Sequence, residues 1–159
     1  MLTVGVDPGL TGAVGFLRNG EYMTLFDMAT ILKGSGSVKQ EVDPIGLRRQ
    51  FFAQIPQLEE DLAIALERVS AMPGQGSSSV FSFGDTYGCC RSVASLTGYP
   101  LHLVTPATWK KHFGLGRDKE ESRALASRLF PKAELHLKKH ADRAEALLIA
   151  RWLWDTQFK

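Results

Sequence analysis

Four acidic residues lie at the ends of apolar segments, where the packing of a buried core does not require a charged side chain. Asp7 and Glu67 each end a short apolar run, and Asp142 and Glu145 lie three residues apart at the start of a long apolar segment. Residues spaced by three on a helix lie on the same side, so these two carboxylates can face one point. Crowded carboxylates repel one another and raise their pKa values unless a cation neutralises them. The four acids are therefore candidate ligands for Mg²⁺, which prefers oxygen, and a pair of such ions can promote phosphodiester hydrolysis.

Each acid also has an ordinary structural explanation. Asp142 can complement the dipole of the helix that it begins, with Glu145 as its capping partner. Asp7 precedes Pro-Gly and can be a turn residue, and Glu67 can pair with a nearby arginine. Each explanation suffices for one residue, but the convergence of four acids favours a metal site. A basic side chain seated among these carboxylates would argue against that site.

Basic side chains cluster in the second half of the chain. The net charge is only +2, but residues 109–143 carry ten Lys and Arg against five Asp and Glu. Such clusters can neutralise nucleic-acid phosphates, although solvated helix faces explain them equally well. Lys119, after a Gly-x-Gly turn, can orient a phosphate or a water at a metal site, and His140 can serve as a ligand or proton donor. The candidate contacts with nucleic acid are Lys110, Lys111, Arg117, Lys119, Lys138 and Lys139.

The acids must be positioned by a sheet and a helix. The apolar patterns predict strands over residues 2–7, 13–17 and 22–26, with an Asn-Gly pair typical of a type I′ turn between the second and third. A polar stretch at 33–42 precedes a predicted helix from 44 to 55, and the uninterrupted apolar run at 62–66 predicts a strand buried on both faces. If the first strand and the one at 62–66 are neighbours, Asp7 and Glu67 meet at their carboxyl ends.

The remaining elements are predicted from their caps and turns. The Gly- and Ser-rich residues 70–84 read as a mobile loop before a helix at 85–96 and a strand at 101–104. Thr105-Pro106 begins a short helix, and Asp118 with Glu121 resembles a capping box for a helix ending at Phe130. The last helix, about 141–156, is apolar nearly all round and should be packed deep. This order predicts an α/β fold with one mixed five-stranded sheet, its first three strands antiparallel, flanked by helices.

Length and composition limit the class of protein. With 159 residues, 44% of them hydrophobic and 23% charged, the chain suits a single globular domain spanning residues 1–159. The longest apolar stretch is too short for a membrane span, and the N-terminal residues do not read as a signal peptide. The two cysteines are adjacent, which suits neither a disulfide framework nor a metal motif. We expect a cytoplasmic protein without a membrane partner.

Five segments resemble one family along almost the whole chain: VGVDPGLTGAVGFL, LAIALERV, SFGDTYG, VTPATWKKHFGLGRDKEE and HADRAEALLIARW. They are similar to the RuvC-type Holliday junction resolvases of the RNase H-like superfamily. The resemblance implies two Mg²⁺ ions, replaceable by Mn²⁺, held by Asp7, Glu67, Asp142 and Glu145, with Lys119 as a catalytic lysine beside them. It also implies a homodimer that cuts a four-way junction symmetrically and leaves 5′-phosphate nicks.

The chain departs from the family pattern at two places. The last motif here is Asp142 followed by Glu145, with His140 just before, so the second metal is expected to be held differently. The aromatic residue that follows the strand-terminal Glu in cellular members is missing, and Phe81 or Phe83 would have to replace it on the DNA. These departures suit a phage-encoded or otherwise divergent member. Two alternatives remain: a broader nuclease for flaps, branched DNA or RNA-containing duplexes, and a non-catalytic nucleic-acid-binding module.

Overall fold

A mixed five-stranded sheet forms the centre of the molecule. The computed structural model describes residues 1–34, 40–55, 61–71 and 74–159. The strand order is β3-β2-β1-β6-β7, in which β1, β2 and β3 are antiparallel and β6 and β7 run parallel to β1. The strands are β1 (Leu2–Asp7), β2 (Ala13–Arg18), β3 (Glu21–Asp27), β6 (Leu62–Glu67) and β7 (Leu101–Val104). This confirms the predicted sheet, including the parallel pairing that brings β1 beside β6.

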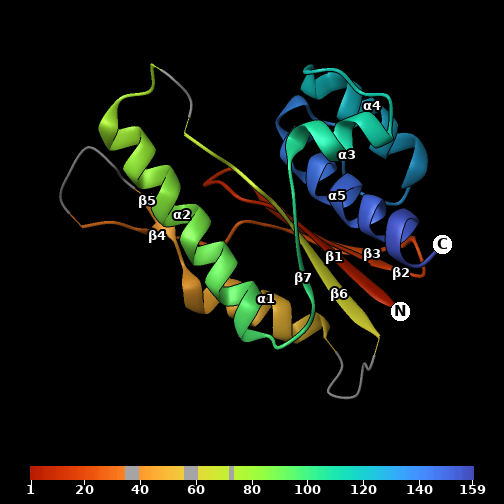
Figure 1. Cartoon of the computed structure of the whole chain (residues 1–159), viewed down its shortest axis with the longest axis horizontal. Coiled ribbons are helices and arrows are strands. Elements are labelled where there is room, and N and C mark those ends of the chain that lie inside the picture. Colours follow the sequence, from red (N-terminus) through yellow and green to blue (C-terminus); the bar gives the residue numbers. More distant parts are fainter. Residues whose placement is uncertain (35–39, 56–60, 72–73) are drawn as a thin grey trace.

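Helices cover both faces of the sheet (Figure 1). On one face, α1 (Pro44–Gln54) and α2 (Ser77–Leu96) share an apolar core with the strands. On the other face, α5 (Ala141–Gln157) lies across β1, β2 and β6, and α3 (Pro106–His112) and α4 (Lys119–Leu129) pack against α5. The arrangement is an RNase H-like α/β fold, as predicted. Within the described residues, no helix combines the length and apolar character needed to cross a membrane.

The two faces of the central strands differ in side-chain size. The large residues of β1 and β6 point toward α1 and α2, whereas the small residues Gly5, Ala63 and Ala65 lie under α5. A Cβ atom on Gly5 would collide with the backbone oxygen of Ala146, so the helix rests almost directly on the sheet. Because side chains alternate along a strand, Asp7 projects from the same face as Gly5. The close approach of α5 therefore occurs on the face that carries the acids.

The predicted hairpin turn was confirmed, whereas the predicted capping box at the start of α4 was confirmed only in part. The β2–β3 hairpin turns at Asn19 and Gly20, whose φ angles of 51° and 78° are those of the expected type I′ turn. Asp118 caps α4, as predicted, by accepting from the backbone N–H of Glu120 at 2.9 Å. The capping box itself was wrong, because the Glu121 carboxylate accepts from the N–H of Gly116 at 2.7 Å. Glu121 thereby ties the glycine turn to the helix that follows it.

Four elements differ from the prediction. Helix α2 begins at Ser77 and not near residue 85, so the predicted loop at 70–84 is wrong for its second half. Two short strands, β4 (Thr30–Leu32) and β5 (Gln40–Val42), pair in a separate sheet that the polar stretch gave no reason to expect. A 3₁₀ turn, η1 (Lys138–His140), leads into α5. The interior of the polar stretch and residues 72–73 lie outside the described residues.

Candidate metal centre

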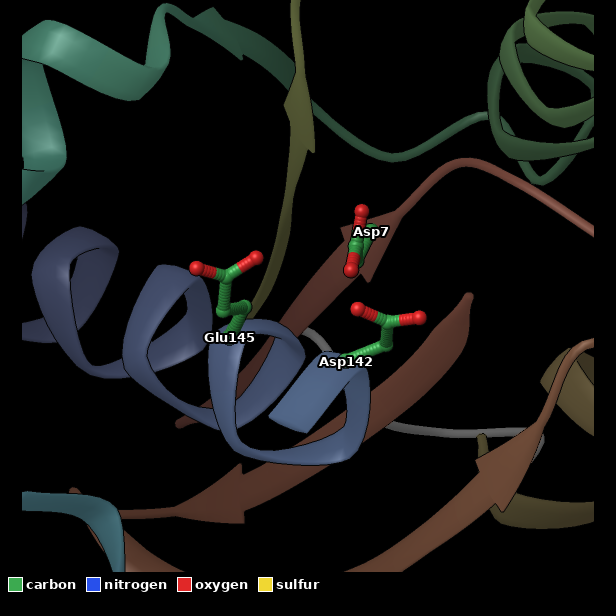
Figure 2. A group of neighbouring side chains, drawn as sticks. All are labelled: Asp7, Asp142 and Glu145. Carbon is green, nitrogen blue, oxygen red and sulfur yellow. The ribbon is translucent and has the colours of Figure 1, made fainter. Parts of the chain in front are cut away.

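Three carboxylates converge above the end of β1. Asp7 is the last residue of that strand, and Asp142 and Glu145 project from the first turns of α5. An oxygen from each of the three lies within 4.8 Å of the others, and Figure 2 shows the carboxylates directed toward a shared space. Asp7 and Glu145 are buried and Asp142 is half-buried. Hard oxygen donors at this spacing fit a divalent cation such as Mg²⁺ or Mn²⁺.

Glu67 completes the set from the neighbouring strand. It ends β6 beside Asp7 and lines the same hollow of about 320 Å³ as the other three acids, together with Phe83, Lys110 and Lys119. We call this space the acid hollow. Glu67 is not within the 4.8 Å group, and its Oε2 accepts a 2.7 Å hydrogen bond from Nε1 of Trp109 in α3.

The acid hollow holds more negative than positive charge. Burial raises the pKa of Asp7 well above its ordinary value, and the charges of Glu67, Asp142 and Glu145 raise it further. Burial also raises the pKa of Glu67, although its hydrogen bond from Trp109 acts in the opposite direction. A site that disfavours its own ionised carboxylates gains when a cation binds, because the cation removes their mutual repulsion.

Two lysines reach into the acid hollow. The Nζ atom of Lys110 lies 2.7 Å from Oε1 of Glu145, and Lys119 pairs with Asp142 and lies 3.7 Å from Oε2 of Glu145. Burial lowers the pKa of Lys119, but the carboxylates outweigh burial and raise it overall. These ammonium groups compete with a metal ion for two of the acids.

The competition is incomplete. Among the described residues, Asp7 and Glu67 have no ion pair, so the two ammonium groups pair with only two of the four acids. The Lys119 side chain is also 56% exposed, which leaves it room to withdraw into solvent. The donor set therefore still fits a divalent cation, despite the basic side chains that would argue against one.

Three contacts to the acids were not anticipated from the sequence. Thr11 donates its hydroxyl to Asp142 at 2.7 Å, and Ser122 donates to Glu145 at 3.3 Å. Trp109, in the short helix that begins after Thr105, donates its indole N–H to Glu67. Ser122 could have been found by its helical spacing from Lys119, because residues three apart share a face. Nothing in the local sequence connects Thr11 or Trp109 to its distant partner.

The predicted DNA contacts are spread over four places. Lys110, Lys111 and Arg117 line a second hollow of about 810 Å³, the basic hollow, which adjoins the acid hollow at Lys110. Phe83 lines the acid hollow itself. Phe81, one of the two candidate aromatics, is 78% exposed on the outer side of α2.

The basic residues before α5 lie apart from the acids. Lys138 and Lys139 are exposed in η1. His140 is buried, its ring meets His136 edge-on at 5.3 Å, and its Nδ1 accepts from the backbone N–H of Leu137 at 3.4 Å. Burial lowers the pKa of His140. The structure thus gathers the four acids and two lysines but does not bring His140 into the acid hollow.

Comparison with known proteins identifies the fold. No protein-family model and no curated protein matches the sequence. The structure of T. thermophilus RuvC in complex with a Holliday junction substrate matches with a TM-score of 0.63 at 20% identity, over 96% of this chain and 91% of that one. A further structure of Thermus thermophilus RuvC matches with a TM-score of 0.56 at 19% identity, over 96% and 92%. The chain therefore has the RuvC-type form of the RNase H-like fold.

Proposed function

We propose that this protein is a divalent-metal-dependent endonuclease that resolves four-way DNA junctions. The observation that carries the proposal is the convergence of Asp7, Glu67, Asp142 and Glu145 in one partly buried hollow of a RuvC-type fold. Structural carboxylates are not crowded in this way, because each destabilises the others when ionised. The fold alone does not define an activity, so the argument depends on this site.

The residues of the acid hollow have distinct roles in the proposed reaction. Two divalent cations would activate a water molecule and stabilise the departing 3′ oxygen. Asp7 at the end of β1, Glu67 at the end of β6, and Asp142 and Glu145 on α5 would hold these cations through their carboxylate oxygens. Lys119 ends in the same hollow on a half-exposed side chain, where its ammonium can bind a phosphate oxygen once a cation has replaced it beside Asp142.

The surface around the acid hollow suits a DNA strand. The basic hollow offers Lys111 and Arg117 to phosphates of a bound strand, which would provide affinity without reading sequence. Phe83 offers an apolar face inside the acid hollow, on which a base near the cut can stack. Lys138 and Lys139 would contact a more distant part of the backbone. A homodimer would place two such sites on one junction, so that symmetric cuts leave 5′-phosphate nicks.

A nicking assay tests the proposal. The purified protein is incubated with mobile and immobile four-way junctions in Mg²⁺, Mn²⁺ or EDTA, and cuts are mapped on every arm. We expect symmetric metal-dependent nicks from the wild type, and from Asp7→Asn we expect junction binding without nicking. Asp61→Asn, an exposed residue outside the hollow, is the matched control and should cut normally. Unchanged nicking by Asp7→Asn would refute the assignment.

Substrate comparison separates the remaining alternatives. Equal cutting of three-way junctions, flaps or RNA-containing duplexes would indicate a broader nuclease. The pairing of Lys110 and Lys119 with two of the acids is the feature that favours a non-catalytic binding module. For such a module, calorimetric titration with Mn²⁺ would show no binding while the protein still bound junction DNA.

A further inference from the structure

One acid of the metal centre is held by an aromatic side chain. Trp109 is fully buried in α3, and its indole Nε1 donates a 2.7 Å hydrogen bond to Oε2 of Glu67. We propose that Trp109 is a positioning residue of the metal centre, which fixes the orientation of the Glu67 carboxylate and leaves its other oxygen for a divalent cation. This inference rests on the proposed metal-dependent function and adds a residue to its site.

The indole is a different kind of partner from those of the other acids. Asp142 and Glu145 meet ammonium groups, which repel an incoming cation as well as pairing with the carboxylates. An indole N–H is a neutral donor that cannot accept a hydrogen bond or gain a proton at ordinary pH. It therefore favours the charged form of Glu67 without adding a positive charge to the hollow. Like Asp7, Glu67 can receive a cation without first losing a basic partner.

The position of the indole is itself fixed by the fold. Strand β7 leads directly into α3, where the Thr105 side chain accepts from the N–H of Thr108 and a proline occupies the first turn. The ring is packed in the apolar core that α5 and α4 share with the sheet. Since a fully buried ring cannot rotate without displacing its neighbours, the Nε1–H keeps one direction. The orientation of the Glu67 carboxylate follows from that direction.

The residue after Trp109 holds an acid from another element. The Nζ of Lys110 lies 2.7 Å from Oε1 of Glu145 and 5.1 Å from the centroid of the Trp109 ring. Two consecutive residues of α3 thus contact one acid of the sheet and one of α5. Loss of the indole N–H would release Glu67 while leaving the contact of Lys110 in place, so the role of Trp109 can be separated from that of its neighbour.

Calorimetric titration with Mn²⁺ at one fixed pH tests the inference on the full chain without reference to activity. Trp109→Phe removes the N–H and keeps an aromatic ring, and we expect it to weaken Mn²⁺ binding about tenfold to a hundredfold, the usual effect of losing a partner that orients a metal ligand. Trp152→Phe is the matched control, because Trp152 packs against the same apolar core and should leave the affinity unchanged. Thermal unfolding in EDTA reports the fold of each variant.

A double-mutant cycle distinguishes positioning from a general structural effect. If Trp109 acts through Glu67, Trp109→Phe should have no further effect on Mn²⁺ affinity in the Glu67→Gln background. An equal loss in both backgrounds would overturn the inference. If Trp109→Phe does not fold, benzothienylalanine at position 109 removes the N–H at nearly constant shape and should give the same loss.

The failure of this inference differs from the failure of the proposed function. Mn²⁺ binding by the wild type with unchanged affinity in the Trp109 variant overturns the positioning role and leaves the metal-dependent nuclease standing. No Mn²⁺ binding by the wild type overturns both.

Discussion

Replacing Asp7 by Asn should stabilise the metal-free protein and abolish the stabilisation that a divalent cation provides. Asp7 is buried beside three other acids, and burial and their charges raise its pKa well above 3.8. A raised pKa means that the folded chain keeps a proton that the unfolded chain has already lost. Stability in EDTA is therefore lost as the pH rises from about 4 through the pKa of the folded state. An amide at position 7 has no proton to lose and avoids that loss.

The size of the effect follows from the spacing of the acids. At an effective dielectric constant of about 20, two carboxylates 4.8 Å apart repel each other by about 3 kcal/mol. Lys119 offsets part of this for Asp7, so we expect Asp7→Asn to gain about 1–3 kcal/mol at pH 8 in EDTA. For a domain of this size that corresponds to an increase in Tm of about 2–10 °C. A cation at a hundred times its Kd should stabilise the wild type by about 2.7 kcal/mol.

Differential scanning calorimetry across a pH series, in EDTA and in excess Mn²⁺, measures both quantities. The Tm advantage of Asp7→Asn should be largest in EDTA at pH 8 and should shrink toward pH 4, where the wild-type carboxyl is protonated. In Mn²⁺ the wild type should gain stability and the variant should not. A variant that is less stable than the wild type in EDTA at pH 8 would refute the account of a strained carboxylate cluster.

Three other substitutions test separate parts of the structure. Lys119→Met removes a cation from the acid hollow and should tighten Mn²⁺ binding about threefold to tenfold in calorimetry while slowing nicking, whereas weaker binding would contradict the proposed competition. Gly5→Ala places a Cβ against the backbone of α5, and this overpacking should lower the free energy of unfolding in urea by about 3 kcal/mol or more. An unchanged free energy of unfolding would contradict the close packing of α5 on β1. Asp27→Asn breaks the bidentate pair with Arg143, which lowers the pKa of Asp27. Because the carboxylate is 63% exposed, urea unfolding should show a loss of under about 1 kcal/mol at pH 7. That loss should disappear as the pH falls from 3.8 through the lowered pKa of Asp27 in the folded state.

The sheet could be predicted because its signals are local. The Asn19-Gly20 turn accounts for the hairpin, and the apolar run before Glu67 has the length and composition of a doubly buried strand. Once β1 and β6 were taken as parallel neighbours, the meeting of Asp7 and Glu67 followed from strand geometry. The acids of α5 followed from helical spacing.

The start of α2 could not be predicted in the same way. Gly76 provides no side-chain cap, and a serine-rich first turn has weak helix propensity. The helix there is supported by packing of its later turns, where Cys90, Val93 and Ala94 are buried in the apolar core shared with α1 and the sheet. Such tertiary support is not visible in a window of serine and glycine residues.

Contacts between distant segments could not be predicted from the sequence for a similar reason. Trp109 and Glu67 are brought together only by the placement of α3 over the end of β6, and Thr11 reaches Asp142 across most of the chain. The seating of lysine side chains among the acids is likewise a property of the assembled fold. Residue types suggested which groups can carry the chemistry, but not which groups hold them in place.

The dispersal of the acids along the chain has a consequence for biosynthesis. Asp7 is synthesised early, whereas the helix that supplies Asp142 and Glu145 is made only after all five strands of the central sheet, and it packs on β1. Contacts of such long sequence separation form late and slowly in folding. A nascent or prematurely terminated chain lacks both the layer that closes the sheet and half of the carboxylates. The proposed metal site therefore cannot assemble before the residues of α5 have been made.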